Sequence, residues 1–401
     1  MKPINKAMSH PSDAQTKHTH FLYNPTFRSA LFQLIAVGIV AFVLFTIVNN
    51  ALTNLASRGI ATGFAFLEQP AGFGISQSLV AYDETYSYAR TFLVGLLNTA
   101  LVSVLGILFA TLLGFILGIA RLSRHWLISR LATVYIEIFR NIPLLLQIFF
   151  WYFVVLRALP STKQSMHLGE WFYLNIKGLY LAKPVFGTGS GWVAMALIIG
   201  VIACWLLSIW AHNRQRLTGQ QTPIYRYVLL CCVALPLMVY WLLGQPIGLE
   251  YPVLRGFNFQ GGISVLPEFA ALLVALTIYT ASFIAEIVRS GINAVNHGQT
   301  EAAMSLGLPR SHTLKLIIIP QALRIIIPPL TSQYLNLTKN SSLAMAIGYP
   351  DLVSVFAGTT LNQTGQAIEI ISMTMLVYLS LSLITSALMN LYNRKVALVE
   401  R

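Results

Sequence analysis

The chain has 401 residues, of which 56% are hydrophobic and only 10% are charged. That charged share is less than half of the ~25% typical of soluble domains, and several apolar stretches are long enough to cross a bilayer. The composition predicts an all-α polytopic membrane protein in contact with lipid. The net charge of +13 indicates basic residues gathered in cytoplasmic loops rather than a nucleic-acid-binding surface.

The apolar stretches predict eight membrane spans, which follow a polar tail of residues 1–28. The spans are expected at about residues 29–48, 90–120, 131–156, 191–210, 227–243, 268–288, 325–347 and 367–389. With both chain ends inside, the inner segments hold 17 Lys and Arg residues and the outer segments hold seven. Because basic residues are retained on the cytoplasmic side, this count places both termini in the cytoplasm.

The small residues and cysteines inside the spans do not form a pattern typical of a metal or catalytic site. Gly114 and Gly118 are spaced for a close helix–helix contact, although chance explains the pair equally well. The three cysteines, at positions 204, 231 and 232, lie in apolar spans and are interpreted as small buried residues. No pattern indicates a metal site or a catalytic residue, so we expect neither.

Residues 300–329, TEAAMSLGLPRSHTLKLIIIPQALRIIIPP, form a polar segment between two apolar blocks. A helix-forming run opens at Glu301 and ends at Leu306. Gly307 can then close that helix in a left-handed conformation, and Pro309 is suited to the first turn of a second helix. The first helix is too short to be stable alone, which is typical of an element that docks into a groove on another protein.

The spacing within this segment resembles the cytoplasmic EAA loop of permease subunits in binding-protein-dependent ABC importers. The matching residues are Glu301, Ala302, Ala303, Gly307, Ile317 and Pro320. Ile319 stands where the pattern has leucine, which preserves the apolar volume. The resemblance implies that this loop, with all of these residues except Ile317, couples the chain to a separate ATPase subunit. The alternative is an incidental polar loop between two spans.

The resemblance also implies a domain plan. Residues 86–156 and 266–401 would form a five-span permease core that contains the coupling loop. Residues 29–85 would add a first span with a periplasmic segment, and residues 157–265 would be an insertion with two spans. Within the family, the run from Leu335 to Leu343 and the run from Ile347 to Asp351 are most similar to general L-amino-acid permeases of the polar amino-acid branch.

The seventh predicted span carries several polar residues at positions that are expected to lie within the apolar part of the bilayer. Ser332, Asn336 and Asn340 recur every four residues beside Lys339, so they share one helical face. Polar groups that face lipid cost several kcal/mol each, so this face lines either a translocation path or a seam between helices. Lys339 favours the path, where it would attract a carboxylate or hold an acidic group such as Glu137. Two prolines at 328 and 329 are expected to bend or break the entry of the helix.

Charged residues also lie near the inner ends of two spans. Glu137, Arg140 and Asn141 supply the acceptors and donors that a zwitterionic amino acid needs, but charges at this depth can also pair with each other. The two interpretations remain open for these three residues. For Glu286 and Arg289, three positions apart on a helix, a structural ion pair is favoured.

Three classes of function compete for such a chain: an importer permease, a stand-alone secondary transporter or channel, and a membrane enzyme. The chain contains no Walker A pattern, so we expect no cofactor here, with ATP and Mg²⁺ on a partner ATPase. The resemblance implies alternating access in the bacterial inner membrane. Its expected partners are an ATPase dimer, a second and different permease subunit, and a periplasmic amino-acid-binding protein.

Overall fold

The structure is a computed structural model that describes residues 25–57, 62–220 and 224–396. It is mostly helical, which confirms the predicted class. The described chain divides into two compact units, a small one of residues up to 65 with residues 364–369, and a large one with the remainder. Each unit is described by itself.

The small unit consists mainly of α1 (Pro25–Ser57), which carries the predicted first span. Its apolar stretch, Phe27–Ala51, is long enough to cross a membrane. Elsewhere in this unit, the backbone N–H of Gly63 donates to Glu369 Oε1 at 2.6 Å. Most of the predicted cytoplasmic tail, residues 1–24, lies outside the described residues.

The large unit is built on long helices with shorter elements between them. The long helices are α2 (Tyr88–Arg121), α5 (Ser190–Thr218), α8 (Pro267–Asn293), α11 (Ile319–Asn340) and α13 (Ala367–Val396), of which residues 367–369 belong to the small unit. The shorter ones are η2 (Ala65–Glu68), α3 (Trp126–Asn141), α4 (Leu144–Phe149), η3 (Phe150–Val155), η4 (Leu156–Ala158), η5 (Thr162–Gln164), α6 (Ile224–Leu229), η6 (Leu230–Ala234), α7 (Leu235–Leu242), α9 (His297–Ser305), α10 (Arg310–Thr313), η7 (Leu314–Ile318), η8 (Ser341–Ile347), η9 (Val353–Thr360) and α12 (Leu361–Thr364).

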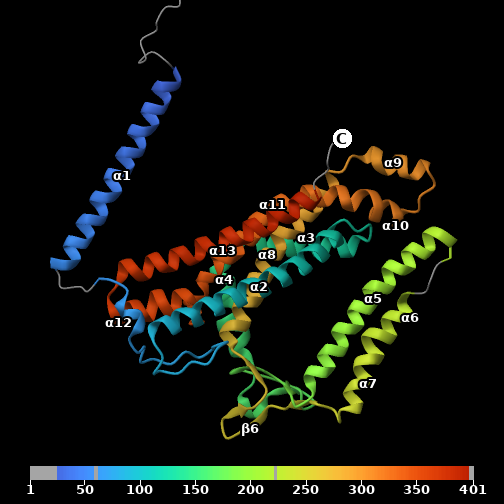
Figure 1. Ribbon diagram of the computed structural model, residues 1–401, viewed down its shortest axis with the longest axis horizontal. Helices are drawn as coiled ribbons and strands as arrows, with labels where there is room; N and C mark the ends of the chain where they lie inside the picture. Colours follow the sequence, from blue (N-terminus) through green and yellow to red (C-terminus); the bar gives the residue numbers. More distant parts are fainter. Residues whose placement is uncertain (1–24, 58–61, 221–223, 397–401) are drawn as a thin grey trace, which may run out of the picture. The chain divides into compact units, whose positions relative to one another are not determined.

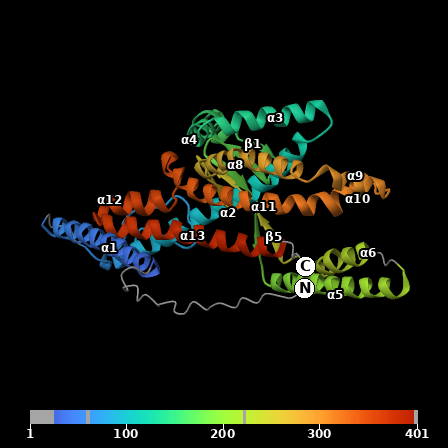
Figure 2. The ribbon, with the colours of Figure 1, turned by 90° about the horizontal axis from the view of Figure 1, so that it is seen from above.

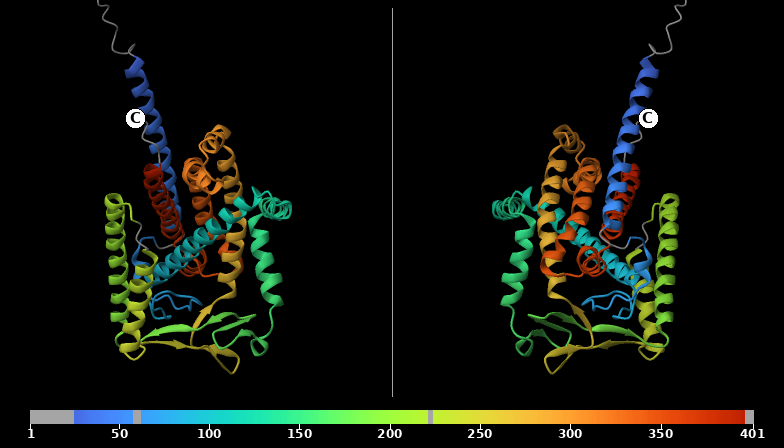
Figure 3. Two further views of the ribbon diagram at one scale, coloured as in Figure 1. Left: turned by 90° about the vertical axis from the view of Figure 1, so that its right-hand side faces the viewer. Right: turned by 90° about the vertical axis from the view of Figure 1, so that its left-hand side faces the viewer.

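Six of the eight predicted spans are confirmed as helices long and apolar enough to cross a membrane. The fifth is shorter, a helical stretch at Tyr227–Leu242. The third is not one continuous helix as predicted, because α3 and the segment Leu144–Ala158 meet at 106°. Pro143 explains the break, since it disfavours a helical residue before it, and Ile142 is extended at φ −95°, ψ 128°. In Figure 3, α3 is seen nearly end-on, above the segment that follows it.

Of the predicted bend or break at the two prolines of the seventh span, the structure contradicts the break. Pro328 and Pro329 lie inside α11, which the structure continues from Ile319 to Asn340. Prolines are tolerated inside membrane helices when neighbouring groups compensate for the lost hydrogen bonds. The polar residues of this span therefore stand on one continuous helix.

Close packing of α2 on α8 organises the centre of the large unit. A Cβ atom on Gly114 would lie 2.6 Å from Ile284 Cβ, and one on Gly118 would lie 2.7 Å from Val288 Cβ. Real Cβ atoms essentially never approach so closely, so the two glycines are required by the contact. Of the two explanations for this pair, the close helix–helix contact is the correct one.

Gly118→Leu should therefore prevent stable folding. The added side chain would meet both Val288 and the carbonyl of Ala285, 2.8 Å from the new Cβ, and overpacking typically costs about 1–3 kcal/mol and occasionally more. Gly38→Leu is the matched control, because a Cβ there has no atom within 4 Å. In detergent, we expect aggregation of the first variant and a near-normal unfolding temperature for the second; equal stability would contradict this packing.

Two segments that were predicted to lie outside the cell carry short strands, which were not predicted. They are β1 (Met166–Leu168), β2 (Phe172–Asn175), β3 (Gly178–Leu181), β4 (Lys183–Phe186), β5 (Ile247–Glu250), β6 (Val253–Arg255), β7 (Asn258–Gln260) and β8 (Ile263–Val265). One antiparallel sheet has the order β1-β2-β3-β8, and two further pairs are β4-β5 and β6-β7. Figures 1 and 3 place this lobe at the end of the large unit opposite α9.

A buried polar cluster fixes the loop that follows η8. The Asn98 side chain donates to the carbonyl of Pro350 at 2.8 Å, and Leu352 N–H donates to Thr99 Oγ1 at 3.0 Å. Tyr349 and Leu352 are fully buried in the two cores on either side of this loop. These contacts hold the loop against α2.

Candidate functional site

The predicted short helix of the polar segment is present as α9, and it starts earlier than expected. Asn296 caps its first turn, since its Oδ1 accepts from Gly298 N–H at 2.8 Å. At the other end, Gly307 has the predicted left-handed conformation, with φ +71°. Pro309 is the residue that caps α10 rather than its first helical residue.

Two backbone hydrogen bonds close α9 around Gly307. Gly307 N–H donates to the carbonyl of Met304 at 2.9 Å, and Leu308 N–H donates to that of Ala303 at 3.1 Å. This is the Schellman pattern, which satisfies carbonyls that a helix end otherwise leaves free. The turn returns the chain so that α10 packs beside α9, as Figure 2 shows.

The surface of α9 is only partly as predicted. Glu301 and Ala302 are exposed, whereas Ala303 is 1% exposed and packs inside the chain. Of the two alanines of the coupling motif, only Ala302 is therefore open to a partner in this chain, because adjacent helical residues point in directions ~100° apart. Two large apolar side chains, Met304 and Leu306, are 60% and 80% exposed instead. Pro320 is half-buried in the first turn of α11.

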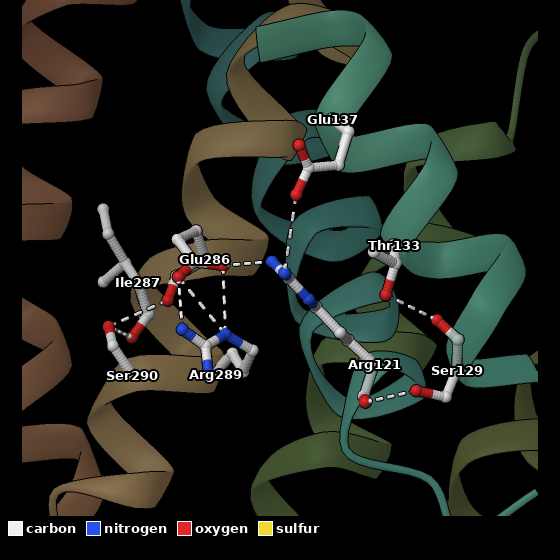
Figure 4. A network of polar contacts seen from close by, with 8 residues as sticks. All are labelled: Arg121, Ser129, Thr133, Glu137, Glu286, Ile287, Arg289 and Ser290. Atoms are coloured by element: carbon white, nitrogen blue, oxygen red, sulfur yellow. Dashed lines mark hydrogen bonds and ion pairs between the residues drawn. The ribbon is translucent and has the colours of Figure 1, made fainter. Parts of the chain in front are cut away.

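An ion network joins three helices shortly before α9. Glu286 on α8 pairs with Arg121, at the end of α2, and with Arg289, whose Nη2 lies 2.5 Å from Glu286 Oε1. Arg121 Nη2 also lies 3.8 Å from Glu137 Oε1 on α3. Figure 4 shows Arg121 between the two carboxylates. The predicted pair of Glu286 and Arg289 is confirmed, and Arg121, which sequence analysis missed, connects it to α3.

The three candidate residues of α3 stand around this network rather than beside Lys339. Glu137 is exposed and pairs with Arg121. Arg140 lies over the Phe283 ring, 5.3 Å from its centroid. The Asn141 side chain donates to the carbonyl of Glu137 at 2.7 Å. The idea that Lys339 holds Glu137 is wrong for this chain, because Glu137 is paired at the other end of the helices.

The predicted polar side chains of α11 lie together on one side of the helix. Ser332, Asn336 and Lys339 are exposed and Asn340 is half-buried, while Leu337 and Thr338 are buried against the rest of the chain. Lys339 lies in the last turn of α11, where the helix dipole favours a cation. Within the described residues, no carboxylate pairs with it. Charged side chains of membrane-spanning helices almost always face a bundle interior, a water-filled cavity or a partner, so we expect the same of this face.

Comparison with known proteins identifies the chain. Residues 206–398 match the family described as binding-protein-dependent transport system inner membrane component. A putative amino-acid ABC transporter permease of Escherichia coli K12 is 54% identical over 94% of this chain and 96% of its own length. This chain belongs to the family of binding-protein-dependent transport system inner membrane components. It is a permease subunit of an ABC importer, which supports the first of the three competing functions over the stand-alone transporter.

Two further relatives carry more specific names. A general L-amino acid transport system permease of Rhizobium johnstonii is 52% identical over 95% of each chain. A glutamate/glutamine/aspartate/asparagine transport system permease of Rhodobacter capsulatus is 40% identical over 98% of the permease described here and 99% of its own length. The predicted resemblance to amino-acid permeases is thus confirmed.

Proposed function

We propose that this permease moves amino acids into the cell across a bacterial inner membrane by alternating access. A periplasmic binding protein delivers the amino acid, and a dimer of ATPase subunits, which carries the ATP and Mg²⁺, drives the cycle. The names of relatives over 94–98% of this chain support the substrate class. The permease itself contributes the path and the docking helix, and it has no catalytic role.

The observation that carries this proposal is the construction of α9. It is a short capped helix with exposed apolar side chains, Met304 and Leu306, beside Glu301 and Ala302. It follows α8 closely, so a displacement of α9 would pull on the helix that bears Glu286 and Arg289. The Arg121 bridge would then pass this movement to α2 and α3.

The open polar face of α11 supports pairing with another permease subunit. Ser332, Asn336 and Lys339 are uncovered in this chain, and burial against a second permease would remove them from lipid while leaving a polar path between the two. We propose a heterodimer, in line with the subgroup that the sequence resembles. The division into core residues 86–156 and 266–401 and insertion 157–265 stays a prediction.

A topology experiment tests this proposal, because α9 must face the ATP-containing compartment. We expect a reporter that is active only outside the cytoplasm to be active when fused after Gly262, in the β lobe. The same reporter fused after Gly298, or at the C-terminus, should be silent. Activity after Gly298 would place α9 outside the cell and overturn the proposed function.

A further inference from the structure

A cavity of about 580 Å³ lies between α13 and the junction of α11 with η8. Its polar lining consists of Lys339, Ser342, Thr374, Tyr378 and Ser382. The last three are on α13, a helix that the sequence analysis did not connect with transport. Lys339 belongs both to the lining of this cavity and to the uncovered polar face of α11, so the cavity and that face adjoin at this residue.

Three of the four hydroxyl groups in this cavity already donate a hydrogen bond to another group of the chain. Ser342 Oγ donates to the carbonyl of Lys339 at 2.7 Å. Thr374 Oγ1 donates to the carbonyl of Ile370 at 2.8 Å. Tyr378 OH donates to Asp351 Oδ2 at 3.4 Å. These three oxygens therefore have no donor left for a ligand while the helices keep this arrangement.

Two groups in the cavity are free to donate. Neither the Lys339 ammonium nor the half-buried Ser382 hydroxyl has a polar partner in the part of the chain that the structure describes. No acidic residue lines the cavity. Asp351 is fully buried behind Tyr378 and accepts from Ser354 N–H at 2.8 Å. The cavity thus presents one positive charge, one spare hydroxyl donor and no exposed carboxylate, a combination that selects an anion.

We propose that this cavity is the subsite that holds the carboxylate of the transported amino acid, bound by Lys339 and Ser382. The inference rests on the proposed function, because only a substrate of this permease would travel along the adjoining face. Met375 and Leu379 supply an apolar wall for the aliphatic part of the ligand. The same anion chemistry would suit the phosphate of a lipid headgroup, so the experiment separates these two sources.

The test uses cysteine labelling of the assembled complex in nanodiscs, with the three native cysteines replaced by alanine. At Ser382→Cys, an anionic methanethiosulfonate reagent should react about tenfold or more faster than a cationic one, because Lys339 attracts it. Adding Lys339→Met should bring the two rates close together. Ser380→Cys is the matched control, since Ser380 is exposed on the same helix and does not line the cavity.

Protection identifies the ligand. A mixture of the common L-amino acids should slow labelling of Ser382→Cys and leave Ser380→Cys unaffected. Ser342→Cys, a second position in the cavity, should behave like Ser382→Cys and covers the case in which that variant does not fold. Equal rates with both reagents, or slowing by anionic lipid but not by amino acids, would overturn the subsite. Absence of ATP-driven amino-acid uptake by the complex with its native cysteines would instead contradict the proposed function.

Discussion

Gly307→Val should separate the permease from its ATPase while the spans remain inserted. The left-handed φ of +71° costs an ordinary L-residue about 1–2 kcal/mol, and a β-branched residue fits it poorly. Strain at this turn would open the two hydrogen bonds that close α9 and misplace Met304 and Leu306. We expect the amount of ATPase that co-purifies with the permease to fall about tenfold or more. A tenfold weaker association corresponds to a loss of ~1.4 kcal/mol of binding free energy.

Two variants make this experiment specific. Gly219→Val imposes the same strain at the end of α5, where φ is also +71° and a Cβ has no atom within 4 Å, so it should leave co-purification unchanged. Gly307→Asn should retain most of the ATPase, because asparagine tolerates the left-handed conformation. Normal co-purification by Gly307→Val would exclude α9 as the docking element.

Lys339→Met should abolish most amino-acid uptake without preventing assembly. Methionine keeps much of the apolar stem and removes the charge, and a hydrogen bond to a charged group contributes about 1.5–3 kcal/mol. We therefore expect uptake to fall by about tenfold to a hundredfold at limiting substrate. Radiolabelled uptake and size-exclusion chromatography of the complex measure the two properties separately.

Lys183→Met is the control for this prediction, because Lys183 is exposed on β4 in the lobe of short strands, away from α11. Its uptake should be close to normal. If Lys339 belonged to a dry seam between helices, its loss would leave a partner unpaired, and assembly would fail before transport could be measured. Normal uptake by Lys339→Met would remove the polar face of α11 from the path.

Backbone sterics and the spacing of residues along a helix were enough to predict much of the coupling loop. The left-handed Gly307 and the i, i+3 pair of Glu286 with Arg289 follow from backbone sterics and helix spacing, and both are present. The inward direction of Ala303 could not be predicted in the same way. It depends on α9 packing beside α10, which is a tertiary contact.

The bend before α4 was predictable in principle. Pro143 disfavours a helical Ile142, but the apolar length of residues 131–156 outweighed this local signal. The lobe of short strands also had a signal, since Asn175 to Gly178 form a turn between two aromatic-rich runs. The sequence carries no signal for the Arg121 bridge or for the cavity on α13, because each joins helices that are far apart in the sequence.

ATP-dependent uptake tests the central claim most directly. The permease, its ATPase, its second permease subunit and its binding protein are reconstituted in proteoliposomes oriented so that α9 and the ATPase face the compartment that contains ATP. We predict that labelled amino acid accumulates on that side with ATP and Mg²⁺, and that accumulation stops when the ATPase is omitted. Accumulation at an undiminished rate without the ATPase would contradict the account, because the chain would then transport on its own.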